Sequence, residues 1–437
     1  MGKKGKVIDL SRRPKDQYRL FDQAFITKLG KLLENRAFIA HTPTDKLEDV
    51  KNKQAWDKDF EYDIQRFRIL ADLWVSTYFG NSVAWDEYNT LIEHLQSPDL
   101  EWAKLLQKKS VQRAIAVSEE RRFFHWELEF PEVFYDEKGN RKPNPGFDAV
   151  IGNPPYVDSE EMAKSHAELR QYCSTQWKAA SGNWDLFVVF VELGLTLSRS
   201  GGYSSLIVPN KLLGAEYSAG IQSLLKSNQP VSFRDFSSVK VFDTDVYPIV
   251  YVVQVRKGTP NDILSLSKMA TSGLEPPTLA FEKRIKLKVL TSLPEGYWWP
   301  IFSDNIGIIS KAVEVSKPLA DYANVIGAAT VSESYKIAEL LTPLGKASSG
   351  DEYLVFVNTG TIDRYESLWA VDPTQYIKGT YRKPVVSRKA LSQEMPTRYE
   401  QARAPKLILA GMVKSLEGLY DADGMILAGK STVCVFR

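Results

Sequence analysis

The sequence predicts an α/β protein that has a helical region before its central α/β part and a mixed α+β region after it. Three observations predict this arrangement. Apolar residues recur at helical spacing up to residue 122, short apolar runs alternate with helical patterns between 146 and 255, and beyond 300 the segments become short and basic. Alternating strands and helices predict a mainly parallel sheet that is covered on both faces.

Length and composition limit the class of protein. At 437 residues the chain is too long for one ordinary core, so two or three domains are expected. No apolar run approaches the roughly 18 to 20 residues of a membrane helix, and no signal-peptide core follows the basic N-terminus, so we expect a cytoplasmic protein without a membrane partner. The two cysteines cannot build a disulfide framework, and the scattered His and Cys residues show no metal-ligand spacing, so no metal is expected.

Residues 1–122 are expected to form a helical N-terminal region. Its first residues are a basic, solvated tail, and a short helix is predicted over Arg19–Asn35. The strongest helical stripe runs over residues 61–79 and ends at Gly80, and two more helices are predicted before residue 116. This region carries no recognisable catalytic constellation.

The central part, residues 123–257, opens with an aromatic segment, Phe123–Phe134, that we interpret as a packed lid or strand. Its glutamates Glu127, Glu129 and Glu132 are open to two interpretations. They are either a carboxylate cluster for acid–base or metal chemistry, or outward-facing strand positions, and the second interpretation is the simpler one.

The stretch Phe147–Tyr156 is predicted to be a buried strand that delivers a rigid polar loop to a cleft. In that loop Asn153 offers a side-chain acceptor, the two prolines remove backbone donors and fix φ, and Tyr156 offers a stacking face. Asn153 Oδ1 and the Pro154 carbonyl would accept the two N–H groups of an exocyclic amine while Tyr156 stacks on its ring. Such a base must be flipped out of a duplex. A purely structural Asn-Pro-Pro turn is the alternative.

Further elements follow this loop along the chain. Helices are predicted over 159–173, 185–198 and 212–227, with strands at 203–208, 231–236 and 249–255, the last two forming an antiparallel edge hairpin. Proline and glycine breaks then predict a connector over 258–300. Residues 301–437 are expected to form a separate domain with strands at 353–357, 385–386, 406–409 and 431–436.

Basic residues gather in this last domain with tyrosines between them. The residues concerned are Lys378, Arg382, Lys383, Arg388, Lys389, Arg398, Arg403 and Lys406, with Tyr376, Tyr381 and Tyr399. The formal net charge of +2 does not show whether the chain binds nucleic acid, because nucleic-acid affinity depends on local basic patches. The pattern fits a nucleic-acid face, and an ordinary solvated surface explains it equally well.

The Asn-Pro-Pro-Tyr segment resembles motif IV of amino-group DNA methyltransferases. The wider pattern is similar to adenine-N6 enzymes of the γ arrangement, above all to type IIG restriction–modification enzymes and related phage-defence methylases. The segments that carry this resemblance are Phe124–Phe134, Phe147–Tyr156, Asn183–Phe190, Gly201–Pro209 and Val241-Phe242. The resemblance implies a partial class I methyltransferase (Rossmann-like) sheet, and it implies that residues 301–437 are a DNA target-recognition domain, either whole or truncated.

The resemblance also implies the roles of particular residues. Asn153 and Pro154 would accept hydrogen bonds from the target amino group, Tyr156 would stack on the flipped adenine, and Phe242 would cover its other face. Pro155 and Phe190 would lie near the adenine of the cofactor, S-adenosyl-L-methionine. Double-stranded DNA is the implied partner. The methyl group would pass directly from sulfonium to nitrogen, with positioning and water exclusion supplying the catalysis.

The chain also departs from the family pattern. The family's Gly-rich cofactor turn lies upstream of motif IV, and no such turn follows a strand before residue 147; no nuclease-like strand stands out either. We therefore expect only the acceptor half of a methyltransferase, with a companion chain supplying the cofactor half. A non-catalytic DNA-recognition subunit, an inactive gene fragment and an unrelated α/β protein remain alternatives. The loop itself suits adenine or cytosine, and only the resemblance favours adenine.

Overall fold

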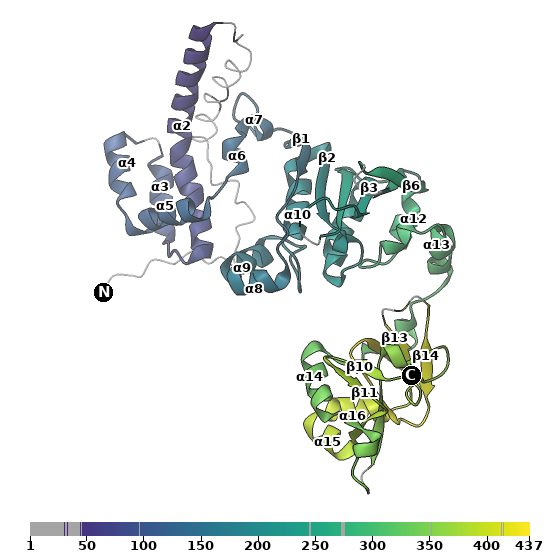
Figure 1. The fold of residues 1–437 in the computed structure, drawn as a ribbon. Coiled ribbons are helices and arrows are strands. Elements are labelled where there is room, and N and C mark those ends of the chain that lie inside the picture. The colour runs from purple at the N-terminus through teal and green to yellow at the C-terminus, as the bar shows by residue number, and fades with distance from the viewer. Residues whose placement is uncertain are drawn as a thin grey trace, which may run out of the picture. The chain divides into compact units, whose positions relative to one another are not determined.

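The computed structural model describes residues 46–437 together with Gly30, Leu33 and Thr44, except for residues 96, 244–245, 272–275, 351, 412 and 414. The predicted basic tail and most of the predicted helix Arg19–Asn35 lie outside the described residues. The chain divides into two compact units, Met1–Glu314 and Val315–Arg437, which Figure 1 shows in purple to green and in green to yellow.

The first unit begins with a helical part. It comprises α2 (Leu47–Ser76), η2 (Thr77–Phe79), α3 (Trp85–Glu93), α4 (Asp99–Leu106) and α5 (Lys109–Arg121). The apolar stripe predicted over 61–79 is buried, with Ile64, Leu70 and Leu73 fully covered. The helix stops where Gly80 takes the left-handed conformation at φ 78°, which glycine adopts without steric cost. The predicted helical region is confirmed over the described residues.

The aromatic segment that follows is two short helices, α6 (Trp126–Glu129) and α7 (Pro131–Phe134), so the predicted strand is wrong. The segment packs against Phe147, and its role as a lid stays a prediction. Pro131 opens the second helix, where its missing N–H is not needed. The glutamates form separate ion pairs: Arg141 Nη1 lies 2.7 Å from Glu127 Oε1, and Arg68 Nη2 lies 3.0 Å from Glu129 Oε1. These contacts favour structural roles over a catalytic carboxylate cluster.

A six-stranded sheet follows the helical part in the first unit and lies to its right in Figure 1. Its order is β1-β2-β4-β3-β5-β6. The strands are β1 (Phe147–Gly152), β2 (Ser198–Pro209), β3 (Gln229–Ser238), β4 (Pro248–Gln254), β5 (Ile263–Ala270) and β6 (Thr278–Lys286). The helices around it are α8 (Ser159–Ser165), α9 (Ala167–Gln176), α10 (Phe187–Leu197), α11 (Ala219–Ser227), α12 (Leu287–Ser292) and α13 (Ile306–Val315).

The sheet is mixed, which corrects the prediction of a mainly parallel one. Only β1–β2 and β3–β5 pair in parallel, whereas β4 is antiparallel to both β2 and β3. The predicted antiparallel pairing of the 231–236 and 249–255 strands is confirmed. Their predicted edge position is wrong, because β4 inserts between β2 and β3 and the edges are β1 and β6.

The predicted connector over 258–300 is also wrong, because β5, β6 and α12 lie there and extend the sheet. Leu264 and Leu266 of β5 are fully buried, and β6 pairs with β5 along its length. The Pro and Gly residues that suggested a linker lie in the turns between these elements. Turn residues do not distinguish a hairpin loop from an interdomain connection.

The main core covers one face of the sheet, not the predicted two. Phe233, Tyr251 and Val253 point into this core together with α10 and α11. The opposite face is only partly covered, as the half-burial of Ile207 and Val250 shows. The strand over 147–152 is an edge strand and not the predicted buried one.

The second unit contains two four-stranded sheets and a hairpin. The sheet orders are β15-β9-β12-β8 and β14-β13-β16-β7, and β10 pairs with β11. The strands are β7 (Asn324–Gly327), β8 (Thr342–Pro343), β9 (Tyr353–Val357), β10 (Thr374–Tyr376), β11 (Gly379–Tyr381), β12 (Pro384–Ser387), β13 (Lys406–Ala410), β14 (Gly418–Asp421), β15 (Ile426–Ala428) and β16 (Thr432–Phe436). The helices are α14 (Val331–Leu340), α15 (Arg388–Glu394) and α16 (Pro396–Arg403).

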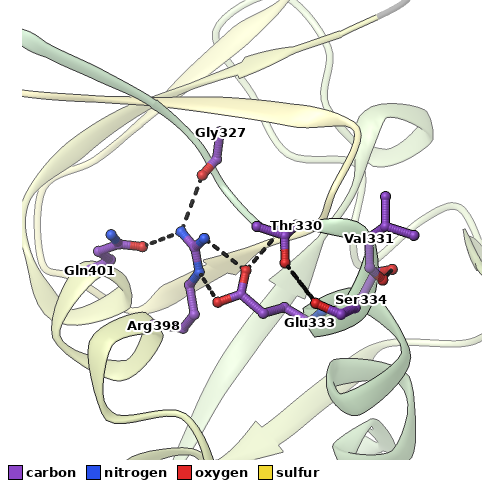
Figure 2. A network of polar contacts seen from close by, with 8 residues as sticks. Gly327, Thr330, Val331, Glu333, Ser334, Arg398 and Gln401 are labelled. Atoms are coloured by element: carbon purple, nitrogen blue, oxygen red, sulfur yellow. Dashed lines mark hydrogen bonds and ion pairs between the residues drawn. The ribbon is translucent and has the colours of Figure 1, made fainter. Parts of the chain in front are cut away.

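A bidentate ion pair joins α14 to α16 in this unit (Figure 2). Arg398 Nε and Nη2 donate to Glu333 Oε1 and Oε2 at 3.0 and 2.8 Å, and the Thr330 backbone N–H donates to Glu333 Oε2 at 2.7 Å. Hydrogen bonding from Arg398 is the largest cause that lowers the pKa of Glu333 from 4.5 to about 2. Glu333 therefore stays ionised, and paired with Arg398, across the physiological pH range.

This pKa makes the stability of the second unit depend on pH. The lowered pKa means that the stabilisation from Glu333 is complete above the unfolded-state pKa of 4.5 and is lost as the pH falls through about 2. We expect Glu333→Gln to lower the free energy of unfolding by about 1–3 kcal/mol at pH 7, and by less at pH 3. Urea unfolding of both proteins at the two pH values measures this. A difference that does not shrink on acidification contradicts it.

Candidate functional site

The Asn153–Tyr156 loop leaves the sheet at the carboxyl end of β1. β1 and β2 are parallel, and their pairing extends to Gly152 and Leu206. The loops that follow the two strands therefore lie at the same end of the sheet, beyond the carboxyl ends of the strands, which is where open α/β sheets bind ligands. Asn153 and Pro155 are exposed, Pro154 is buried and Tyr156 is half-buried. The Asn153 side chain has no hydrogen-bond partner among the residues that the structure describes, so its acceptor oxygen is available.

Tyr156 and Phe242 come together although they are far apart in the sequence. Their ring centroids are 5.7 Å apart at an interplanar angle of 85°. The Tyr156 hydroxyl donates to the Ile207 carbonyl of β2 at 2.9 Å, and burial raises the pKa of Tyr156 to about 12. An edge-to-face pair has no flat slot between its rings, so a base that stacks on both of them requires Phe242 to turn.

The two residues predicted to contact the cofactor have different surroundings from those of the aromatic pair. Pro155 is exposed on the loop, and Phe190 lies on α10, half-buried against the main core. Within the described part of the chain, Phe190 makes no ring contact with Tyr156 or Phe242. The roles of Pro155 and Phe190 stay predictions.

Asp185 binds the segment that follows the loop, and its role was not predicted from the sequence. Its Oδ1 accepts from the Ser159 backbone N–H at 3.0 Å, and its Oδ2 accepts from Lys211 Nζ at 2.9 Å and from the Tyr217 hydroxyl at 2.8 Å. Burial, followed by the bond to Asp185, raises the pKa of Tyr217. The carboxylate thus joins the start of α8 to η3 (Asn210–Leu213) and η4 (Glu216–Ser218). A charged residue at the start of an apolar helix was the available signal.

Asn210 connects the end of β2 to the segment that carries Phe242. Its backbone N–H donates to the Tyr247 carbonyl at 2.7 Å, and its Nδ2 donates to Ser237 Oγ at 2.9 Å. Three loops therefore meet at one end of the sheet, beyond the carboxyl ends of β1 and β2. They are the loop after β1, the loop after β2 and the loop between β3 and β4. The candidate site is built from these loops.

The Asp185 contacts allow a test of how the site is held. We expect Asp185→Asn to lower the free energy of unfolding by about 1.5–3 kcal/mol, because it removes hydrogen bonds to a buried charge. It should also accelerate amide hydrogen exchange over residues 153–160. The matched control is Asp148→Asn, because Asp148 pairs with Arg199 at 2.6 Å on the surface with its side chain 87% exposed, and such pairs contribute little. Equal effects of the two changes contradict this role for Asp185.

The described residues show neither a metal centre nor a complete cofactor site. Among the described residues, no group of three His, Cys, Asp or Glu side chains could hold a metal ion. None of the buried, unpartnered side-chain atoms in the described part of the chain lies in the loop or on α10. The residues that the structure describes do not form a complete site for S-adenosylmethionine.

A cavity of about 350 Å³ lies elsewhere in the first unit. It is lined by Val75, Phe79, Arg121, Arg122, Phe123, Phe124, His125, Leu169 and Tyr172. The lining does not include Asn153 or Tyr156. This hollow is therefore separate from the candidate site.

The basic residues of the second unit fall into two groups. Those paired with carboxylates are Arg388 with Glu352, Arg398 with Glu333, Arg403 with Glu400, and Lys406 with Asp421. Lys378, Arg382, Lys383 and Lys389 are exposed and have no acidic partner among the described residues. The first three flank the turn and the end of the β10–β11 hairpin. We call Lys378, Arg382 and Lys383 the basic hairpin.

The tyrosines of the predicted nucleic-acid face are not free for stacking. Tyr376 is buried in the core of the second unit, and Tyr381 and Tyr399 pack against that core. Arg403 lies 5.4 Å from the centre of the Tyr399 ring. The predicted basic, aromatic face is therefore reduced to the basic hairpin and Lys389.

Residues 26–242 match the Eco57I restriction-modification methylase family. The matched range contains the Asn153 loop, Asp185 and Phe242. The resemblance to restriction–modification methylases is therefore confirmed.

Individual relatives agree with the family match. The chain is 24% identical over 169 residues to the type II restriction enzyme and methyltransferase RM.Eco57I of Escherichia coli, a match that covers 34% of this chain and 17% of that protein. It is 29% identical over 116 residues to the type II methyltransferase M.PaeR7I of Pseudomonas aeruginosa, covering 26% of this chain and 20% of the relative. The chain thus spans a fifth or less of these relatives.

A solved structure matches over a longer range but weakly. The type IIL restriction-modification enzyme MmeI, solved in complex with DNA, covers 96% of this chain and 62% of its own at 10% identity and a TM-score of 0.36. A TM-score this low supports no inference about the arrangement of this chain. No helix among the described residues is long and apolar enough to cross a membrane.

Proposed function

We propose that this chain is the acceptor half of a site-specific DNA methyltransferase that acts on adenine N6 with S-adenosylmethionine as methyl donor, within a restriction–modification or phage-defence system. One observation carries the proposal. The Asn153 side-chain oxygen, which accepts no hydrogen bond from the described residues, lies in the same loop as Tyr156 at the carboxyl end of β1. This loop lies within the stretch that matches a restriction–modification methylase family.

The loop suits a flipped base that carries an amino group. Asn153 Oδ1 and the Pro154 carbonyl accept the two N–H groups, which leaves the nitrogen lone pair less delocalised and more nucleophilic. The Tyr156 ring supplies a stacking surface whose position is fixed by the hydroxyl bond to Ile207. The loop accelerates the reaction by holding the amino nitrogen in position. The hydrogen bonds of Asp185 and Asn210 fix the surrounding loops and so support this positioning. Phe242 turns to cover the second face of the base.

Adenine is preferred because of the family resemblance, and an amino group on cytosine would fit the same acceptors. This chain offers fewer residues for binding the methyl donor than for binding the target base. Only Pro155 and Phe190 are proposed to contact S-adenosylmethionine, whose methyl group is the one transferred. We therefore propose that a companion chain supplies the rest of the donor site.

The domain roles follow the same proposal. Residues 1–122 form a helical region and 123–257 the acceptor half, whose sheet extends through the strands of 258–300. Residues 315–437, the second unit, form the DNA target-recognition domain, and the basic hairpin contacts phosphates there. The predicted boundary at residue 301 lies too early, because Ile301, Phe302 and Ile306 pack in the core of the first unit. Phosphate contacts from Lys and Arg provide position and affinity without sequence information.

The basic hairpin gives a prediction for DNA binding. Combining Lys378→Ala, Arg382→Ala and Lys383→Ala should weaken duplex binding and reduce the slope of log affinity against log salt by roughly 3, about 0.9 for each lost phosphate contact. Fluorescence anisotropy with a labelled duplex across salt concentrations measures the slope. The control combines Lys317→Ala, Lys336→Ala and Lys346→Ala, which removes the same charge from other exposed positions of this unit. Equal slopes for both triple variants contradict the assignment.

Nucleoside analysis tests the proposed function itself. The chain, purified with the polypeptides that accompany it in its own cells, is incubated with duplex DNA and S-adenosylmethionine, and the DNA is digested for mass spectrometry. N6-methyladenine is expected. N4-methylcytosine would contradict the choice of adenine but keep the amino-group chemistry. DNA binding without any methylated base would favour a non-catalytic recognition subunit or an inactive fragment.

A further inference from the structure

The cavity beside Phe79 in the first unit is built by three segments that are far apart in the sequence. Val75 and Phe79 come from the end of α2 and from η2, and Leu169 and Tyr172 come from α9. Residues 121–125, at the end of α5 and after it, complete the lining. The volume of about 350 Å³ lies within the range of small-molecule binding sites, which is roughly 300–1,000 Å³. The cavity is therefore large enough to enclose a ligand of moderate size.

Aromatic rings make up much of this lining and pack against one another. The Phe79 ring centroid lies 5.6 Å from that of Phe123 and 5.4 Å from that of Tyr172, at interplanar angles of 40° and 39°. Phe124, which also lines the cavity, is 52% exposed. We call Phe79, Phe123, Phe124 and Tyr172 the aromatic wall. Its rings suit a flat heterocycle, because stacking of a base on an aromatic ring requires only the face of that base.

Arg122 gives the cavity a positive charge. Its guanidinium has no ion pair or hydrogen bond with the residues that the structure describes, whereas Arg121 Nη2 lies 2.8 Å from Glu168 Oε2. Arg122 also ends α5 in the left-handed conformation, at φ 54°, where glycine is the usual residue because a side chain is strained there. A strained residue that lines a cavity indicates a role for its side chain. Arginine in such a place binds phosphate or carboxylate groups.

His125 gives the cavity an oriented hydrogen-bonding group. Its Nε2 lies 2.7 Å from Oδ1 of Asp72, whose side chain is buried. An ionised carboxylate only accepts hydrogen bonds, so Nε2 carries the hydrogen of the neutral ring and Nδ1 keeps its lone pair. Within the described part of the chain, Nδ1 has no hydrogen-bond partner. The ring therefore offers a fixed acceptor to a hydroxyl or amino group of a ligand.

We propose that this cavity binds a nucleoside 5′-phosphate, either as a free nucleotide or as the 5′-terminal nucleotide of a nucleic-acid strand. The base stacks on the aromatic wall, the phosphate binds Arg122, and His125 Nδ1 accepts from a sugar hydroxyl or a base amino group. An aromatic carboxylate would leave His125 unused, and inorganic phosphate would leave the aromatic wall unused.

This site is distinct from the one proposed for methyl transfer and does not depend on it. The cavity lining includes neither the acceptor residues Asn153 and Tyr156 nor the proposed donor contacts Pro155 and Phe190. A nucleotide bound here would therefore be a second ligand of the first unit. Its binding should not compete with S-adenosylmethionine.

Calorimetric titration of the full chain tests the proposal. AMP and a 5′-phosphorylated single-stranded oligonucleotide are the probes, and saturating binding at micromolar concentration is expected for at least one of them. Adenosine and inorganic phosphate, which each lack one half of the ligand, should bind about 10-fold more weakly or worse. Tighter binding of AMP identifies a free nucleotide as the ligand, and tighter binding of the oligonucleotide identifies a strand end.

Substitutions of Arg122 separate binding from folding. Arg122→Gly removes the guanidinium and relieves the left-handed strain, so it should weaken nucleotide binding about 10-fold or more without lowering the thermal midpoint. His125→Gln should weaken binding as well. The control is Arg113→Ala, which removes an exposed arginine of α5 outside the cavity and should leave the affinity unchanged.

Three results would overturn the proposal. The first is that neither probe binds to the folded chain. The second is that Arg122→Gly and Arg113→Ala have the same affinity for the nucleotide. The third is that S-adenosylmethionine at equal concentration displaces the nucleotide, because the nucleotide would then occupy the methyl-donor site.

Discussion

Replacing Asn153 with alanine is expected to reduce methyl incorporation into DNA by about 100- to 1,000-fold, which is the effect of removing one preorganised polar contact at a reacting group. The amino group would lose its side-chain acceptor, and the Pro154 carbonyl alone would not orient the nitrogen. Incorporation of labelled methyl groups by the complex with its companion chain measures the loss.

Two controls separate chemistry from folding in this experiment. Asn153 is exposed and makes no hydrogen bond among the described residues, so Asn153→Ala should leave the thermal midpoint and DNA affinity unchanged. Asn153→Asp keeps an acceptor oxygen in the same position and should retain more activity than the alanine variant. Full activity of Asn153→Ala would remove the loop from the reaction.

Breaking the buried ion pair in the second unit is expected to have the largest effect on stability. Lys406 Nζ lies 2.5 Å from Asp421 Oδ2, with side chains only 1% and 4% exposed. Asp421 also accepts from the Met425 and Ile426 backbone N–H groups, both at 3.0 Å. Asp421→Ala should lower the free energy of unfolding by about 3–5 kcal/mol, because it leaves a buried lysine charge without compensation.

Urea unfolding measured by tryptophan fluorescence tests this value. The control is Asp423→Ala, two residues away and exposed, which should change the free energy of unfolding by less than about 0.5 kcal/mol. A loss below about 1 kcal/mol for Asp421→Ala would mean that Lys406 finds another partner. The buried pair would then not be what joins β13 to β14.

Local features of the fold could be predicted from the sequence. The helix over 61–79 follows from its apolar spacing, and its end follows from Gly80. The strand over 147–152 and its loop follow from an apolar run that stops at two prolines. The meeting of Tyr156 with Phe242 was implied only by the family resemblance, since no local pattern connects residues so far apart.

Pairing between distant segments could not be predicted in the same way. The position of β1 at an edge and of β4 inside the sheet depends on which strands meet, and apolar runs look the same in either place. The turns of 258–300 resemble a linker for this reason. Charge pairing has the same limit, because Arg398 and Glu333 are 65 residues apart and the basic run could not show which of its members were already neutralised.

We propose that this chain holds the acceptor half of a methyltransferase site and that a companion polypeptide supplies the donor half. Calorimetric titration of the isolated chain with S-adenosylmethionine tests it most directly. We expect weak binding or none, because only Pro155 and Phe190 are proposed to contact the donor. Saturating binding at micromolar concentration by the isolated chain would contradict it.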